Sequence, residues 1–344
     1  MDRVLLVRLG ALGDIIHALP VAAALRRAFP AARIDWLVSA KHRAILDLVS
    51  VIDRRVVIDD RAGAGSALVS AIGELRRGHY DVALDVQGLL KSAVLARFSG
   101  AGRVIGFSSR HLRERLARHF YTEVHDPDGD AASSGPEATH VIRLNLGLLQ
   151  PLGLGVIAPE FPIERVDTAV AREVRERTGG RYALLNPGAA WPNKRWPPAR
   201  LAAVARSLRD THGLTSLVLW GPGEEPLARE VAAGAAEAAR LLPRTTIADL
   251  VALARGAALM LSGDTGPLHV AAAVGTPIVG IYGPTQPARN GPWAARDVTV
   301  SRDAICQCPY LRRCRRDTMC LLDIEAGDVL AAVDRRLGPE PTRV

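Results

Sequence analysis

The stretch that decides the fold runs from residue 257 to residue 273 and reads Ala257-Ala258-Leu259-Met260-Leu261-Ser262-Gly263-Asp264-Thr265-Gly266-Pro267-Leu268-His269-Val270-Ala271-Ala272-Ala273. Its apolar run, glycine turn and small-residue repeat predict a buried strand, a tight turn and a helix. The first turn of such a helix carries free backbone N–H groups and the positive end of the helix dipole, which together favour an anion.

Four residues at this predicted helix start point to a nucleotide or phosphate site: Asp264, Thr265, Gly266 and His269. The alternative is an ordinary strand–helix corner in which Asp264 or Thr265 only caps the helix. Capping does not require an imidazole one turn further along, so His269 favours the binding function.

The same order of strand, loop and helix recurs along the 344 residues. Strands are predicted at 4–7, 33–38, 56–58, 81–86, 182–185, 216–220, 259–262 and 278–282, with helices over 14–29 and from about residue 90. Such alternation is typical of α/β proteins with parallel sheets. A Gly- and Pro-containing stretch without periodicity, 151–162, predicts a linker. We expect two Rossmann-like, doubly wound domains, 1–160 and 161–344, facing across a cleft, and leave open whether the last helix packs back on the first domain.

The chain carries a net charge of +8, with 48% hydrophobic and 23% charged residues. This balance favours a polyanionic partner: nucleic acid, an acidic membrane face or a phosphorylated substrate. The basic residues Arg103, Arg110, Arg113, Arg115 and Arg118 lie close together in sequence, although a solvated basic face would look the same. We expect no nucleic acid, because no known nucleic-acid module accompanies them.

No apolar run is long enough to span a bilayer. The N-terminus imitates a signal peptide, but Arg8 and Asp14 interrupt the apolar stretch. We therefore expect a cytoplasmic protein that rests on the inner face of the cytoplasmic membrane.

All four cysteines fall in one segment, Cys306, Cys308, Cys314 and Cys320. Their spacing does not fit paired C-x2-C zinc sites, so a metal clip, a redox pair and reduced thiols remain open.

Polar residues at the predicted strand ends are candidates for chemistry, because ligands of doubly wound sheets bind beyond the carboxyl ends of the strands. In the first domain these are Asp14, Gln87 and Lys91, and Asp14 is the candidate general base, with helix capping as the alternative. In the second domain Lys194 and the pair Glu224 and Glu225 follow successive strands. Neither a G-x-G-x-x-G nor a P-loop motif is present, and no DxD pair follows a strand to hold a metal-bound diphosphate.

Taken together, these motifs resemble glycosyltransferase family 9, the ADP-heptose:lipopolysaccharide heptosyltransferases of the GT-B fold. The resemblance rests on Leu12-Gly13-Asp14-Ile15-Ile16-His17, Asp85-Val86-Gln87-Gly88-Leu89-Leu90-Lys91-Ser92-Ala93, Asp264-Thr265-Gly266-Pro267-Leu268-His269 and Tyr282-Gly283-Pro284-Thr285. Within the family the chain looks most like heptosyltransferase I, which adds the first heptose to Kdo on lipid A.

The resemblance implies a role for each matching residue. Asp14 becomes the catalytic base. The donor is bound by Lys194, Glu224 or Glu225, Asp264, Thr265, Gly266 and His269. The anionic acceptor is held by Arg8, Gln87, Lys91 and Arg113. The family's hydroxyl residues before the lysine are replaced here by Ala189 and Ala190, and the cysteine-rich tail is more familiar in heptosyltransferase II.

The implied reaction is an inverting, metal-independent transfer of heptose from ADP-heptose to Kdo-lipid A, without a cofactor. A heptosyltransferase II-like acceptor is the nearest alternative. A sugar-nucleotide epimerase of the same fold and a nucleotide-sugar-binding module without activity are the rivals from other classes.

Overall fold

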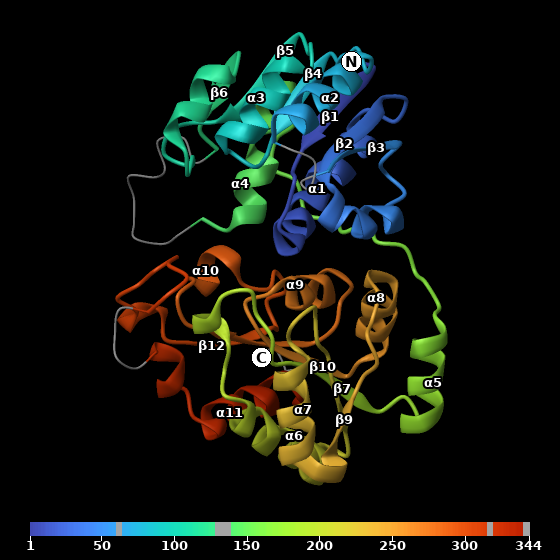
Figure 1. Ribbon diagram of the computed structural model, residues 1–344, viewed down its shortest axis with the longest axis vertical. Helices are drawn as coiled ribbons and strands as arrows, with labels where there is room; N and C mark the ends of the chain where they lie inside the picture. Colours follow the sequence, from blue (N-terminus) through green and yellow to red (C-terminus); the bar gives the residue numbers. More distant parts are fainter. Residues whose placement is uncertain (60–63, 128–138, 315–318, 340–344) are drawn as a thin grey trace. The chain divides into compact units, whose positions relative to one another are not determined.

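The computed structural model describes residues 1–59, 64–127, 139–314 and 319–339. The chain forms two compact units, Met1–Glu164 and Arg165–Val344 (Figure 1). Each unit contains a six-stranded sheet in which all neighbouring strands pair in parallel.

In the first unit the strand order is β3-β2-β1-β4-β5-β6. The strands are β1 (Arg3–Val7), β2 (Arg33–Ser39), β3 (Arg54–Ile58), β4 (Val82–Asp85), β5 (Arg103–Phe107) and β6 (Glu123–His125). The α-helices are α1 (Leu12–Ala28), α2 (Ala64–Arg76), α3 (Leu90–Phe98) and α4 (Val141–Gly147), and the longer 3-10 helices are η1 (Ala40–Leu48) and η2 (Arg115–Phe120).

The second unit repeats this order as β12-β11-β10-β7-β8-β9. Its strands are β7 (Tyr182–Asn186), β8 (Thr215–Val218), β9 (Ala239–Leu241), β10 (Leu259–Gly263), β11 (Ile278–Tyr282) and β12 (Val298–Ser301). Its helices are α5 (Ala169–Thr178), α6 (Pro198–His212), α7 (Glu225–Ala235), α8 (Ile247–Gly256), α9 (Gly266–Ala273), α10 (Pro287–Asn290) and α11 (Ala326–Leu337).

The two sheets confirm the expected doubly wound α/β architecture. The central strands are apolar on both faces because helices cover both sides; Val4 to Val7 and Leu259 to Leu261 are fully buried. The strand order reverses direction between β1 and β4, and again between β7 and β10, which is where ligands of this fold bind. The last helix, α11, packs on β11, β12 and α6, so its apolar face lies in the core of the second unit.

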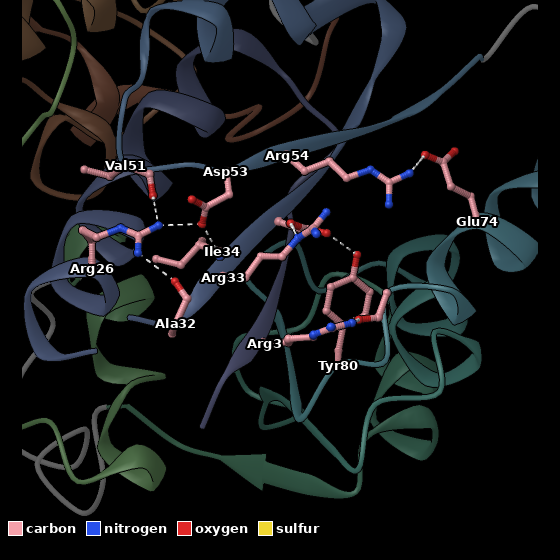
Figure 2. A network of polar contacts seen from close by, with 12 residues as sticks. Arg3, Arg26, Ala32, Arg33, Ile34, Val51, Asp53, Arg54, Glu74 and Tyr80 are labelled. Carbon is pink, nitrogen blue, oxygen red and sulfur yellow. Dashed lines mark hydrogen bonds and ion pairs between the residues drawn. The ribbon is translucent and has the colours of Figure 1, made fainter. Parts of the chain in front are cut away.

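A polar network fixes the amino-terminal edge of the first sheet (Figure 2). The fully buried Asp35 accepts hydrogen bonds from the Tyr80 hydroxyl at 2.8 Å and from Arg33 at 2.9 Å. Arg26, near the end of α1, donates to the Ala32 carbonyl and pairs with Asp53 at 2.6 Å. These contacts tie the beginnings of the strands together, at the edge opposite the candidate site residues.

We expect Tyr80→Phe to lower the free energy of unfolding by about 1–3 kcal/mol, because it removes a hydrogen bond from a buried carboxylate without changing side-chain shape. Urea denaturation measures the change. The matched control is Arg27→Gln, which breaks the exposed Arg27–Glu160 pair and should cost less than about 1 kcal/mol. Equal losses in the two variants would contradict this view of Asp35.

Candidate active site

Asp14 lies in the first turn of α1, just beyond the carboxyl end of β1. Its carboxylate accepts a hydrogen bond from the Ala11 amide at 3.0 Å and pairs with Arg8 at 2.9 Å. Arg8 is almost buried and also donates to the Val86 carbonyl at 2.6 Å. The Asp14 side chain nevertheless keeps 38% of its surface exposed. It is therefore an oriented carboxylate that caps its helix and still offers an oxygen to a ligand.

Gln87 links the loop after β4 to the loop after β1. Its side-chain carbonyl accepts a hydrogen bond from the Leu9 amide at 2.6 Å. Val7 and Asp85 are register partners at the ends of these two strands, so the loops carrying Arg8 and Gln87 run side by side. The structure thus brings Arg8, Asp14 and Gln87 to one place on the sheet edge.

The residue that organises this edge is Asp85, which the sequence analysis did not select. Its fully buried carboxylate accepts hydrogen bonds from the Gln87 and Gly88 amides, the Ser92 hydroxyl and the Tyr121 hydroxyl, all within 3.2 Å. Burial raises the pKa of Asp85, and these four hydrogen bonds only partly offset the rise. Gly88 has a φ of +71°, which favours glycine. The sequence signal for this role is an Asp that ends an apolar strand and precedes Val86-Gln87-Gly88.

Lys91 and Arg113 lie on two adjoining segments. Lys91 is in the first turn of α3, and Arg113 precedes η2; both side chains are exposed. Glu114 joins the segments by accepting a hydrogen bond from the Leu90 amide at 2.6 Å.

The prediction of a basic cluster over residues 103–118 is wrong for one residue, Arg103. Arg103 is the first residue of β5, at the amino-terminal edge of the sheet, and it pairs with Glu123 through two hydrogen bonds of 2.6 and 2.8 Å. Its proximity to the other arginines in the sequence is lost because β5 carries the chain to the opposite edge.

In the second unit, Lys194, Asp264 and His269 form a buried triad. The Lys194 ammonium lies 2.6 Å from one Asp264 carboxylate oxygen, and His269 Nε2 lies 2.9 Å from the other. Each of the three side chains keeps 14% of its surface or less exposed. The Lys194 ammonium also lies 4.5 Å from the centre of the Trp191 ring, so it is oriented from two sides.

The electrostatics of the triad keep Asp264 ionised. Burial alone would raise its pKa, but the hydrogen bond and charge of His269 and the charge of Lys194 outweigh burial, and the pKa of Asp264 lies well below its usual range. The Lys194 ammonium and the His269 imidazole thus hold the ionised Asp264 carboxylate in place at the start of α9.

The start of α9 lies beside this triad. Thr265 is the N-cap residue, and its hydroxyl is bonded to Asn186 at 3.1 Å and to Ser262 at 2.9 Å. Gly266 follows as the first helical residue. A Cβ on Gly263 would lie 2.7 Å from the Lys194 carbonyl, so glycine lets the two loops approach. Asn186 and Ser262, paired in register on β7 and β10, were not selected from the sequence.

Glu224 and Glu225 point to different surroundings. The Glu224 carboxylate accepts a hydrogen bond from the Gly221 amide at 3.0 Å and lies where a Cβ on Gly188 would be, against the loop after β7. Glu225 instead pairs with Arg229 one turn along α7 at 2.5 Å. Of the two, Glu224 is therefore the one that lies against the loop carrying Lys194.

The cysteine segment packs beside the Lys194 loop. The Leu311 carbonyl accepts a hydrogen bond from Asn193 at 2.8 Å. Cys308 Sγ lies 3.6 Å from Cys306 Sγ and 3.3 Å from Cys314 Sγ, and all four cysteines are thiols. Burial raises the pKa of the Cys306 and Cys320 thiols. The described residues contain no group of three or more His, Cys, Asp or Glu side chains arranged to hold a metal ion.

Comparison with known proteins identifies the family. The family model described as glycosyltransferase family 9 (heptosyltransferase) matches residues 69–319. The chain belongs to glycosyltransferase family 9. The chain is 31% identical to lipopolysaccharide heptosyltransferase 1 of Pseudomonas aeruginosa, over 90% of this chain and 86% of that protein. It is 27% identical to lipopolysaccharide heptosyltransferase 3 of Escherichia coli, over 96% of this chain and 98% of that protein.

A solved structure carries the same fold. The E. coli heptosyltransferase WaaC with ADP superposes with a TM-score of 0.73 at 23% identity, covering 97% of this chain and 99% of that one. The fold is therefore the GT-B type of this family, and the family 9 chain is a heptosyltransferase of lipopolysaccharide core synthesis. Among the helices that the structure describes, none is long and apolar enough to cross a membrane.

We expect Asp264→Asn to lower the free energy of unfolding by about 3 kcal/mol near pH 5.5, because it leaves the largely buried Lys194 ammonium without its counter-charge. The folded-state pKa of Asp264 is depressed, so its contribution is complete above the ordinary carboxyl pKa of about 3.9 and is lost as the pH falls toward the lower folded value. Denaturation of both proteins from about pH 5.5 to about pH 2.5 should show the difference shrinking at the acid end. A difference that grows on acidification would contradict the assignment.

Proposed function

We propose that the second unit binds ADP-heptose and the first unit binds the acceptor. The observation that carries the donor assignment is the buried Lys194–Asp264–His269 triad at the start of α9. Cations and helix amide groups favour a diphosphate, and they would also stabilise the negative charge that develops on the leaving ADP. The structure of E. coli heptosyltransferase WaaC with ADP supports the choice of base.

Within the donor site, each residue has a proposed task. Lys194 and the Thr265–Gly266 amides bind the diphosphate, and the replacement of hydroxyl residues by Ala189 and Ala190 leaves backbone groups for the remaining phosphate contacts. Glu224 is the residue proposed to accept hydrogen bonds from the ribose, because its carboxylate lies against the loop after β7 while Glu225 is paired with Arg229.

Asp14 is the proposed general base. Its carboxylate takes the proton from the acceptor hydroxyl as that oxygen forms a bond to the anomeric carbon. The bond from this carbon to the diphosphate breaks at the same time, and ADP leaves with the electron pair. Arg8 holds the carboxylate in position, and a single displacement of this kind inverts the configuration at the anomeric carbon without a metal ion.

The proposed acceptor is Kdo-lipid A, held through its anionic groups by Lys91, Arg113 and the edge formed by Arg8 and Gln87. The highest identity among the relatives reported above, to a heptosyltransferase 1, favours this acceptor over those of the other core heptosyltransferases. Because this acceptor is a lipid, the enzyme is proposed to work at the inner face of the cytoplasmic membrane.

We expect Asp14→Asn to lower kcat at least about 100-fold, since a positioned base contributes roughly 10²–10⁴-fold, while the Kd for ADP stays unchanged. ADP release is measured with ADP-heptose and Kdo-lipid A. The matched control is Asp2→Asn, an exposed carboxylate at the other end of β1. Full activity of Asp14→Asn would remove the proposed base, and conversion of ADP-heptose without acceptor would favour an epimerase.

We expect Lys194→Ala to weaken ADP binding about 10- to 100-fold, because hydrogen bonds to charged groups contribute about 1.5–3 kcal/mol. Glu224→Gln should weaken ADP binding by a smaller factor. Glu225→Gln, next to it in sequence, is the control and should bind as the unaltered protein does. Calorimetry with ADP gives the three constants; an effect of Glu225→Gln equal to that of Glu224→Gln would reverse their assignment.

A further inference from the structure

Three large apolar side chains of the first unit are exposed on neighbouring segments. Leu90 and Phe98 lie at the two ends of α3 and expose 37% and 43% of their surface, and Leu116 on η2 exposes 66%. Helix α3 and η2 pack against each other, so the three exposed residues lie on adjoining segments. Exposed apolar side chains that gather on one face mark an interaction site more often than scattered ones do.

Each of these apolar residues has a basic neighbour in the sequence. Arg97, Arg115 and Arg118 are exposed on the same two segments. Among the residues that the structure describes, neither Arg97 nor Arg115 has a carboxylate partner. We call this surface, with Lys91 and Arg113 at one end, the α3–η2 face; it comprises Leu90, Lys91, Arg97, Phe98, Arg113, Arg115, Leu116 and Arg118.

A cavity opens at the other end of the face. It has a volume of about 380 Å³ and is lined by Arg76, Arg97, Phe98, Gly100, His119 and Phe120. Basic groups beside two phenylalanine rings suit a ligand that has an anionic head and an apolar body. The cavity therefore combines basic and apolar groups, as the α3–η2 face does.

We propose that the α3–η2 face docks this protein on an anionic lipid bilayer. Phe98 and Leu116 enter the boundary between headgroups and acyl chains, Arg97 and Arg115 pair with lipid phosphates, and the cavity receives a headgroup phosphate. An amphipathic surface with basic and apolar residues binds a bilayer in this way. The charge of the face is complementary to anionic lipid, and each basic residue near such a surface strengthens binding about fivefold.

The position of the face deepens the proposed function. Its Lys91–Arg113 end lies at the carboxyl edge of the sheet, on the segments that follow the Asp85–Gly88 loop. A bilayer along α3 and η2 would bring a lipid-borne acceptor to the residues proposed to hold it. This delivery of the acceptor rests on the proposed function, whereas lipid binding by the face needs no acceptor.

The test is co-sedimentation of the full chain with vesicles of phosphatidylglycerol and phosphatidylethanolamine, and with vesicles of phosphatidylcholine alone. We expect binding to the anionic vesicles that weakens with salt, and weak binding to phosphatidylcholine. The double variant Phe98→Glu/Leu116→Glu should lose binding more than tenfold, and Arg97→Gln/Arg115→Gln should lose it about tenfold or more on anionic vesicles only.

The control variant is Val156→Glu/Arg177→Gln, which changes one fully exposed apolar residue and one exposed arginine elsewhere. It should bind vesicles as the unaltered protein does, and all variants should keep the ADP affinity and melting temperature of that protein. Vesicle binding that survives in the two face variants would overturn the proposal. Absence of vesicle binding by the unaltered protein would also overturn it and would leave an acidic protein as the occupant of the face.

Transfer assays separate this proposal from the proposed function. The face variants should lose transfer to acceptor embedded in anionic vesicles and keep transfer to acceptor dispersed in detergent. Equal transfer to both forms would contradict the docking face. No transfer by the unaltered protein to either form, with vesicle binding intact, would contradict the proposed function and leave the docking face standing.

Discussion

The structure of the second unit depends on one buried carboxylate, Asp264. It follows β10 directly and is paired with Lys194 from one loop and His269 from α9. Without it, the Lys194 ammonium would lie largely buried at the sheet edge with no counter-charge, which costs several kcal/mol. The same pairing orients Lys194 against Trp191 and fixes the first turn of α9. One ionic contact thus orders the site that is proposed to bind the donor.

The first unit has a counterpart at the equivalent strand. Asp85 ends β4, which pairs with the first strand of its sheet as β10 pairs with β7. The partners of Asp85 are amides and hydroxyls, and burial raises its pKa. The partners of Asp264 are His269 and the Lys194 ammonium, and its pKa falls. Both carboxylates order the loop at the reversal point of their sheet, but only the second is paired with an ammonium group. This difference fits a division into an acceptor-binding and a donor-binding unit.

Most of the fold follows from the sequence, because buried parallel strands are continuous apolar runs that local pattern identifies. The strands that were not predicted are β5, β6, β9 and β12, and the last three of these have only three or four residues. Arg103 shows why: its charge suggested a surface cluster, while its place in β5 depends on pairing with β4 and β6. Asp85 and Asn186 were not predicted as site residues, because a single sequence does not show which polar residue at a strand end is buried among hydrogen-bond partners. The choice between Glu224 and Glu225 needed the position at which α7 begins.

The most direct test is a crystal structure of this protein with ADP-heptose. We expect the diphosphate at the first turn of α9, within hydrogen-bond distance of Lys194 Nζ and the Gly266 amide, with Glu224 on the ribose. A diphosphate bound elsewhere, with Lys194 making no contact to it, would contradict the proposed donor site.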